Sequence, residues 1–235
     1  MLFFIHLKRL ITVKNLFFLP IGSYEQHGPH LPPNTDYLIA EKVAHTVSIP
    51  FQGIIIEGIR IGLSQEHEGF EHTKSISEDE FLLQIQKIFR ELQDDAIFIL
   101  INAHGGNVDA LKKIQKWDEK RILVLNIFSL IKGELEAIRT SDLGGICHAG
   151  EFETSIMLYL FPELVHLNNL NKTDVNYVPF LDPNYKNERN RDWKTIHYSK
   201  SGVLGDPFHA DSIKGQLWFN ALIKKITTFL KEFIV

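Results

Sequence analysis

Four short, almost unbroken apolar runs alternate along this chain with segments in which apolar residues recur at helical spacing. The runs cover residues 16–21, 54–61, 96–101 and 122–127. Strands that are apolar on both faces are typical of a parallel sheet covered by helices on both sides. Helical spacing occurs at residues 37–47, 80–92, 108–117, 152–160 and 213–233. This alternation predicts an α/β fold, a three-layer α/β/α sandwich with a mainly parallel central sheet.

The length of 235 residues suits one α/β domain with a sizeable core, so we expect a single domain over residues 1–235. Ser77 is expected to cap the helix that follows it, because acidic residues at 78–80 suit the positive end of a helix.

Residues 168–200 are polar and rich in Asn and Asp, with scattered aromatic residues. We expect a long loop there, ordered by its aromatic residues over a site or a subunit contact.

Composition excludes several classes of partner. The formal net charge is −4 and no run of Lys or Arg is present, which argues against nucleic-acid binding. No uncharged apolar run approaches the roughly 20 residues of a membrane span. Charged residues interrupt the apolar N-terminus, so it does not resemble a signal peptide. The single cysteine, Cys147, is compatible with a reducing compartment. We therefore expect a cytoplasmic protein.

Three polar clusters follow predicted strands, where open α/β sheets commonly place their ligands. The first contains Glu25, His27 and Asp36. Two carboxylates and an imidazole suit zinc, manganese or iron. Glu25 and His27 either share a turn or reach two separate ions. The alternative is a solvated loop in which Asp36 or Asn34 caps the next helix.

The second cluster follows residues 96–101 and contains His104, Gly105, Gly106 and Asn107. Paired glycines allow the backbone to approach a ligand closely, and N–H groups at a helix start can bind an oxyanion. The alternative is a helix start capped by Asn107 beside an incidental histidine.

The third cluster contains His148, Glu151 and Glu153 at the start of a predicted helix. The helix dipole alone explains one acidic residue there, but it does not explain His148. A thiol nucleophile at Cys147 is the lesser alternative, because adjacent side chains rarely face each other. Ser64, His67 and His72 follow the second predicted strand, and either a ligand cleft or a surface loop accounts for the two histidines.

Together these clusters resemble the creatininase (creatinine amidohydrolase) family. The resemblance is carried by residues 20–28 with His30 and Asp36, by residues 102–107, by residues 148–155, and by residues 202–207 with Gly215. The four blocks occur in family order over most of the chain. The resemblance implies a three-layer α/β/α fold, a homo-oligomer that is frequently a hexamer, and two divalent metal ions. Zinc is the first candidate, and manganese and iron are alternatives.

By the same resemblance, Glu25, His27, Asp36 and His104 match the family's metal ligands, with Asp36 bridging the two ions. Creatinine-hydrolysing members carry a further glutamate ligand where this chain has Gly106. We expect Glu151 to replace that ligand, with Glu153 as the second choice. His148 matches a histidine that acts on substrate. The glycine argues against creatinine, and this form of the motif resembles relatives that act on other amides, among them formamide-opening enzymes and a peptidase-like enzyme.

These residues suggest the hydrolysis of a small, non-peptide and in some cases cyclic amide by a metal-activated water. His148 or Glu153 would carry the proton to the leaving nitrogen. Ser64, His67 and residues 105–107 (Gly105, Gly106 and Asn107) would contact the substrate, with backbone N–H groups of the latter holding the oxyanion. The main alternative is a non-catalytic metal- or small-molecule-binding protein on the same fold. A nucleotide-binding protein is weaker, because no phosphate-binding glycine loop is present.

Overall fold

A four-stranded parallel sheet forms the centre of the protein, with strand order β2-β1-β3-β4. The computed structural model describes residues 15–92, 96–186 and 193–234. The strands are β1 (Leu16–Ile21), β2 (Ile54–Ile55), β3 (Ile97–Asn102) and β4 (Ile122–Asn126). β1 and β3 are buried along their whole length, which is why their sequences do not alternate.

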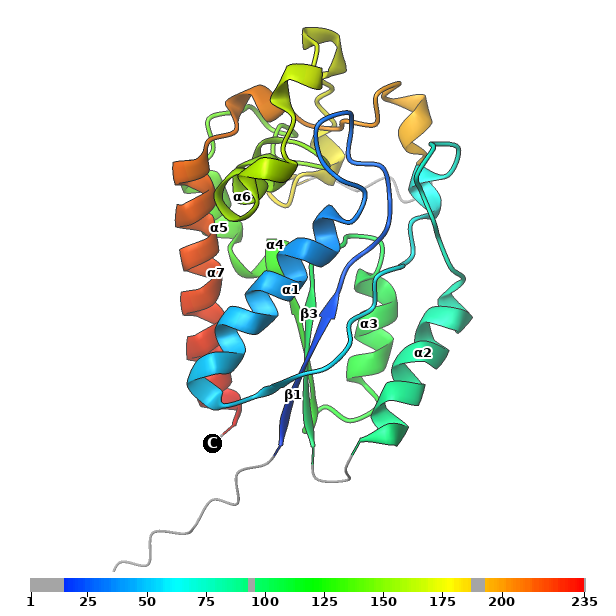
Figure 1. The fold of residues 1–235 in the computed structure, drawn as a ribbon, viewed down its shortest axis with the longest axis vertical. Helices are drawn as coiled ribbons and strands as arrows, with labels where there is room; N and C mark the ends of the chain where they lie inside the picture. The colour runs from blue at the N-terminus through cyan, green and yellow to red at the C-terminus, as the bar shows by residue number, and fades with distance from the viewer. Residues whose placement is uncertain (1–14, 93–95, 187–192, 235) are drawn as a thin grey trace, which may run out of the picture.

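Helices cover both faces of the sheet, so the predicted three-layer α/β/α sandwich is confirmed (Figure 1). The α-helices are α1 (Thr35–Ser48), α2 (Glu78–Glu91), α3 (Val108–Gln115), α4 (Ile127–Leu130), α5 (Lys132–Ile138), α6 (Glu151–Leu160) and α7 (Ser212–Phe233). Short 3₁₀ turns lie at Ile49–Phe51, Gln65–His67, Pro162–Leu164, Leu167–Asn169, Lys172–Asp174, Pro179–Leu181, Thr195–His197 and Pro207–His209. Among the described residues, no helix is both long and apolar enough to cross a membrane.

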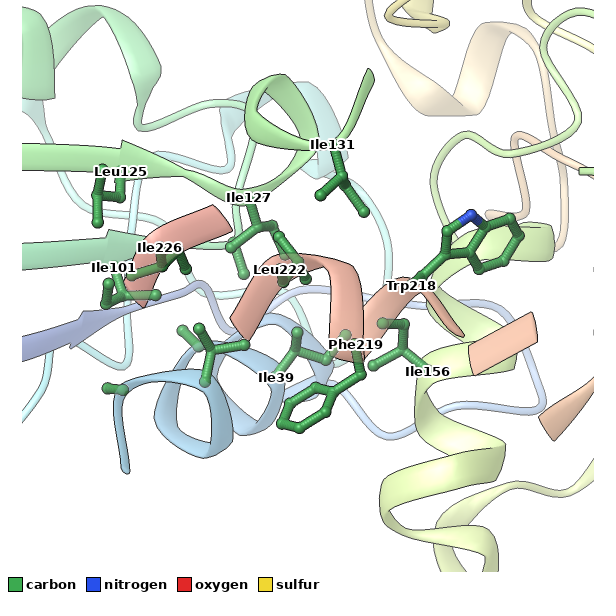
Figure 2. Packing of buried hydrophobic residues seen from close by; sticks show 14 of the residues in the cluster. Ile39, Ile101, Leu125, Ile127, Ile131, Ile156, Trp218, Phe219, Leu222 and Ile226 are labelled. Atoms are coloured by element: carbon green, nitrogen blue, oxygen red, sulfur yellow. The ribbon is translucent and has the colours of Figure 1, made fainter. Parts of the chain in front are cut away.

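The larger core lies between the sheet and the layer that contains α1, α6 and α7. Figure 2 shows Leu222 and Ile226 of α7 among side chains of the sheet, of α1 and of α4, and Trp218 packs against Phe152 of α6. The three residues of α7 recur every four positions and are fully buried, as expected for one face of a helix. A second core, which includes Phe81 of α2 and Leu111 of α3, fills the opposite side of the sheet.

Most predicted elements are present with shifts of one or two residues at their ends. The Ser77 cap is confirmed, because its hydroxyl accepts from the N–H of Glu80 and the Glu80 carboxylate accepts from the N–H of Ser77. The strand predicted at residues 54–61 is shorter than expected. Only Ile54 and Ile55 form a regular ladder, and Ile59 adds one further bridge to Ile21. Ile54 lies on an edge strand and is 47% exposed, so this run is not buried on both faces.

The long irregular segment is ordered over its described part, residues 168–186 and 193–200. Asp182 is fully buried and accepts hydrogen bonds from Arg139 and from the N–H of Gly144. Phe180 makes edge contacts with Trp193 and Tyr198. The aromatic contacts of Phe180 therefore join the two described parts of this segment, and its placement over a site or a subunit contact stays a prediction. The charged residues on which the N-terminal expectation depends (His6, Lys8, Arg9 and Lys14) lie outside the described residues.

Candidate metal centre

Seven acidic and histidine side chains converge beyond the carboxyl ends of β1 and β3, where the loops gather at the top of Figure 1. Four separate segments supply them: the β1–α1 loop with the start of α1, the turn at Gln65–His67, the end of β3, and the start of α6. The residues are Glu25, His27, Asp36, His67, His104, His148 and Glu153. All are buried except His148, whose side chain is 10% exposed.

Asp36 lies at the centre of this cluster, in the first turn of α1. Its Oδ1 is 3.1 Å from Nε2 of His27, and its Oδ2 is 3.0 Å from Nδ1 of His104. The hydroxyl of Ser23 donates to Oδ2 at 2.8 Å. One carboxylate therefore faces two histidines with different oxygens, an arrangement that can bridge two cations.

Glu25 occupies the space between three imidazoles. Its Oε2 is 3.3 Å from Nδ1 of His104, while Oε1 is 3.4 Å from Nε2 of His67 and 3.5 Å from Nδ1 of His148. Both oxygens are buried, yet neither accepts a hydrogen bond from any described residue. A buried carboxylate without hydrogen bonds is strongly destabilising unless a cation compensates it. The donor set around Glu25 therefore fits a divalent cation.

Glu153 faces the same ring nitrogen of His27 as Asp36 does. Its Oε2 lies 3.8 Å from Nε2 of His27 and accepts the N–H of Ala149 at 2.6 Å. His27, His148 and Glu153 form one group of donor atoms that lie within 4.8 Å of one another. Glu25, His27 and Asp36 form a second such group, and Glu25, His67 and His148 a third. Nitrogen and carboxylate donors at this spacing suit zinc or manganese.

Backbone carbonyls orient the histidines on either side of Asp36. Nδ1 of His27 is 3.0 Å from the carbonyl oxygen of Glu25, and Nε2 of His104 is 2.9 Å from that of Leu63. A carbonyl can only accept, so these two nitrogens carry the hydrogens. The opposite nitrogens, which face Asp36, are left to bind a cation, as in many metal sites.

The electrostatics of the cluster fit this interpretation. Burial opposes charge on His27, but the carboxylates of Asp36, Glu153 and Glu25 together outweigh burial and raise the pKa of His27 to about 9. Burial likewise opposes charge on His104, yet Glu25 and Asp36 raise its pKa well above the usual value. Burial raises the pKa of Glu153 to about 8. A cation that takes the same nitrogens must therefore displace protons.

His67 and His148 behave differently from the other two histidines. Burial lowers the pKa of each well below its usual value, and neighbouring histidines add to the effect. Both imidazoles are therefore neutral near pH 7. His67, which the sequence suggested as a substrate contact, lies within the donor cluster.

The prediction that Glu151 completes the metal site is wrong. Glu151 is fully buried, but it points away from the cluster and forms an ion pair with Lys214 of α7. It also accepts hydrogen bonds from the N–H groups of Thr140 and Ser141. The Glu151 carboxylate thus connects α6 to α7 and to the residues that follow α5. Glu153, the second choice, is the residue that faces His27 and His148.

The side chain of Asn107 has a structural role, whereas the oxyanion contact through backbone N–H groups of residues 105–107 stays a prediction. Oδ1 of Asn107 accepts from the N–H of Leu63, and its Nδ2 donates to the carbonyl of Gly22 and to Asn102. The side chain is fully buried, so its amide is not free for substrate. The helix-cap alternative fails as well, because Asn107 stands at the N-cap of α3 but makes no side-chain cap hydrogen bond.

The remaining predicted substrate contacts lie at the edge of the cluster. Ser64 is buried, with its hydroxyl 3.5 Å from Nε2 of His104. Gly105 is exposed and has open space where a side chain would begin. A Cβ at Gly106 would lie 2.0 Å from the carbonyl oxygen of Leu63, so this backbone leaves no room for a side chain there.

Gln26 and His30 are the residues whose roles the sequence analysis missed. Gln26 lies between Glu25 and His27, and its side-chain amide is within hydrogen-bonding distance of both His67 and His148. His30 is buried against the hydroxyl of Thr154. Both residues belong to the first block that carries the family resemblance, and that was the available signal.

A hollow of about 530 Å³ borders the cluster beside Gln26 and His27. It is lined by residues of the β1–α1 loop, the loop before α2 and the irregular segment: Gln26, His27, Gly28, Pro29, Leu31, Pro33, Phe70, Glu71, His72, Asn169, Asn171, Asp174 and Ser201. Its volume falls within the range of small-molecule sites.

The chain is similar in sequence to known proteins over most of its length. The family model for creatininases, described as creatinine amidohydrolase, matches residues 6–230. A mycofactocin precursor peptide peptidase from Mycobacterium tuberculosis is 31% identical over 216 residues, which span 87% of this chain and 80% of the relative. The creatinine amidohydrolase of Pseudomonas putida is 27% identical over 238 residues, 91% of this chain and 88% of the relative.

Solved creatininases share the fold. One creatininase crystal structure superposes with a TM-score of 0.74 at 26% identity, covering 94% of this chain and 91% of the other. Two further solved creatininases, one described as a manganese form and one as a zinc–zinc form of a variant, superpose with the same TM-score.

Proposed function

This chain belongs to the creatininase family of amidohydrolases, and from that premise we propose that it hydrolyses the C–N bond of a small amide with the help of two divalent cations. One observation carries the proposal. The two carboxylate oxygens of Glu25 are buried without a hydrogen bond from any described residue, among imidazole nitrogens of His67, His104 and His148. Such a group needs a cation.

The chain offers ligands for two cations that share Asp36. Glu25, Asp36 and His104 would hold one, because the nitrogen of His104 faces both carboxylates. His27, Asp36 and Glu153 would hold the other, since Nε2 of His27 faces both of those carboxylates. Zinc is the first candidate for these donors, with manganese as the alternative. Bound at these positions, divalent cations would acidify a water and polarise the amide carbonyl.

His148 is the residue we assign to proton transfer. Its Nε2 is 2.7 Å from the main-chain oxygen of Gln26, which leaves Nδ1 directed at Glu25. His148 is neutral near pH 7, and its side chain is partly exposed, so it can accept a proton within the cluster and return it to the leaving nitrogen. Glu153 lies in the same donor group and is the second candidate for this transfer.

The substrate we propose is a cyclic amide, a formamide or a related small molecule. The hollow beside His27 has room for such a compound. Gly106 stands where creatinine-hydrolysing members carry a glutamate ligand, and the carbonyl of Leu63 fills the space that its side chain would need. Creatinine is therefore not our first choice of substrate.

Metal content and chelation test this function together. We expect the purified chain to contain close to two equivalents of zinc or manganese, and to hydrolyse at least one member of a panel of cyclic ureas, formamides and short peptides. A chelator should abolish that activity and added metal should restore it. Metal without any hydrolysis would support a non-catalytic binding protein, whereas hydrolysis that survives chelation would contradict metal dependence.

We further propose that the protein is a cytoplasmic homo-oligomer, with a hexamer as the first expectation from the family. Sedimentation velocity on the purified chain and fractionation of the producing cells test these two expectations separately.

A further inference from the structure

We propose that Gln26 is a positioning residue that fixes which ring nitrogens of His67 and His148 carry hydrogen. Gln26 is buried between two predicted ligands, Glu25 and His27. Its side-chain nitrogen lies 2.9 Å from Nδ1 of His67, 3.0 Å from Nε2 of His148 and 3.1 Å from the carbonyl oxygen of Gly202. One amide with two hydrogens thus faces three neighbours.

Two backbone groups determine how this amide is oriented. The N–H of Gly28 donates to Oε1 of Gln26 at 3.0 Å, and the carbonyl of Gly202 accepts from Nε2. In the flipped orientation, Nε2 would face the N–H of Gly28, and Oε1 would face the carbonyl oxygen of Gly202. Both contacts would be repulsive, so only the first orientation is satisfied.

The main chain of Gln26 assigns His148. Nε2 of His148 is 2.7 Å from the backbone oxygen of Gln26, which can only accept. Nε2 therefore carries the hydrogen and cannot accept one from the Gln26 amide. In the neutral ring, Nδ1 then has a free lone pair, and it is this nitrogen that lies 3.5 Å from Oε1 of Glu25.

The side chain of Gln26 assigns His67. One amide hydrogen goes to Gly202 and His148 accepts none, so the second hydrogen goes to Nδ1 of His67. The hydroxyl of Thr195 lies 2.9 Å from the same nitrogen and can share it as a second donor. Nδ1 is therefore without hydrogen, and the Nε2–H of His67 faces Oε1 of Glu25 at 3.4 Å.

Gly202 makes this placement of Gln26 feasible. Its φ is +90°, and a Cβ built there would lie 1.6 Å from Oε1 of Gln26. The segment at residues 202–207 therefore acts on the cluster through Gln26, although Gly202 has no side chain to contribute. The outcome is two histidines with different roles: His67 directs its Nε2–H toward Oε1 of Glu25 at 3.4 Å without forming a hydrogen bond, while His148 directs the lone pair of Nδ1 toward the same oxygen.

Nitrogen-15 NMR of the histidine rings tests the inference directly. The full chain would be measured with zinc bound and again after chelation, with resonances assigned from His67→Gln and His148→Gln variants. We expect hydrogen on Nε2 of both rings in both states, with Nδ1 of His67 accepting a hydrogen bond. Hydrogen on Nδ1 of His67, or a bare Nε2 on His148, would overturn the assignment.

Gln26→Met keeps the side-chain length and removes both donors. We expect the Nδ1 resonance of His67 to shift because this nitrogen loses the amide donor and keeps only the hydroxyl of Thr195, while His148 keeps its Nε2–H because the main-chain acceptor remains. Gln84→Met, on the exposed side of α2, is the matched control and should change neither ring. An unchanged His67 in Gln26→Met, or a change of tautomer in His148, would contradict the proposal.

Gly202→Ala disturbs Gln26 by crowding and leaves its chemistry intact, so it should shift His67 in the same direction. If either variant fails to fold, the wild-type measurement still decides. The inference rests on the proposed function in one respect, which is that the Nδ1 lone pair of His148 accepts a proton during hydrolysis. A protein without hydrolytic activity would remove that use and leave the nitrogen assignments standing, whereas reversed tautomers would leave the hydrolysis standing.

Discussion

Oε2 of Glu153 lies 3.8 Å from Nε2 of His27, whereas Glu151, two residues earlier on α6, forms an ion pair with Lys214. Successive helical residues are rotated by about 100°, so side chains two positions apart point to nearly opposite sides of the axis. The two glutamates in the first turn of α6 therefore serve different purposes. One belongs to the cluster of histidines, and the other holds helices together.

Glu153→Gln should lower the metal content of the purified chain by about one equivalent, because one of the two carboxylates that face Nε2 of His27 would become an amide. Elemental analysis of dialysed protein measures this. Glu151→Gln is the matched control, since it makes the same chemical change two residues away and should retain both equivalents in the fraction that folds. Equal metal loss in the two variants would contradict the assignment.

Asp36→Asn should reduce the metal content almost to zero, because Asp36 faces both His27 and His104 and an amide is a much weaker ligand for zinc. Asp79→Asn, on an exposed position of α2, provides the comparison. Circular dichroism should show that both variants are folded. A folded Asp36→Asn protein with two tightly bound ions would exclude the bridging role.

Gly106→Ala should destabilise the protein by roughly 1–3 kcal/mol, because the new Cβ would meet the carbonyl oxygen of Leu63 at 2.0 Å and the backbone would have to move. Gly105→Ala adds the same methyl group one residue earlier, where nothing lies within 4 Å, and should be close to neutral. Urea unfolding of both variants gives the difference. Equal stabilities would show that the 102–107 loop is looser than its packing suggests.

The layers of the fold could be predicted because apolar runs and helical spacing are local properties of the sequence. The end of the strand within residues 54–61 could not be predicted. Its regular pairing stops after Ile55 at the edge of the sheet, and where an edge strand stops pairing depends on the strand beside it. Helix α5 was also missed. It contains only Leu135 as a fully buried residue, which is too weak a periodic signal.

Some candidate site residues could be predicted from local sequence, and others could not. Glu25, His27 and His104 follow β1 and β3, and Asp36 lies in the first turn of the next helix, so a shared site could be predicted from their positions after predicted strands. Their roles as ligands came from the resemblance to the creatininase family. His67 and Gln26 depend on contacts with residues that are far away in the sequence, Thr195 and Gly202 among them. The choice between Glu151 and Glu153 required the orientation of α6 about its own axis, and that orientation is set by the packing of α7, to which Lys214 belongs.

Lys214→Met should destabilise the protein by about 3–5 kcal/mol, because it leaves the fully buried carboxylate of Glu151 without its cation. Lys225→Met on the same helix removes a partner of Glu134 in a pair that is 43% and 33% exposed, and should change stability by less than about 1 kcal/mol. Chemical denaturation at neutral pH measures both. A small effect of Lys214→Met would mean that water reaches Glu151.

The same pair predicts how stability depends on pH. Burial raises the pKa of Glu151, but hydrogen bonds from Lys214 and Ser141 outweigh burial, so its pKa is lower in the folded chain than in the unfolded one. A lowered pKa stabilises the folded state above the unfolded-state pKa of about 4.3, and this contribution disappears as pH falls toward the folded-state value. The stability difference between wild type and Glu151→Gln should therefore be constant from pH 8 to about pH 5 and shrink below it. Urea midpoints across this range test the sign, and a difference that grew on acidification would show that Glu151 is protonated in the folded protein.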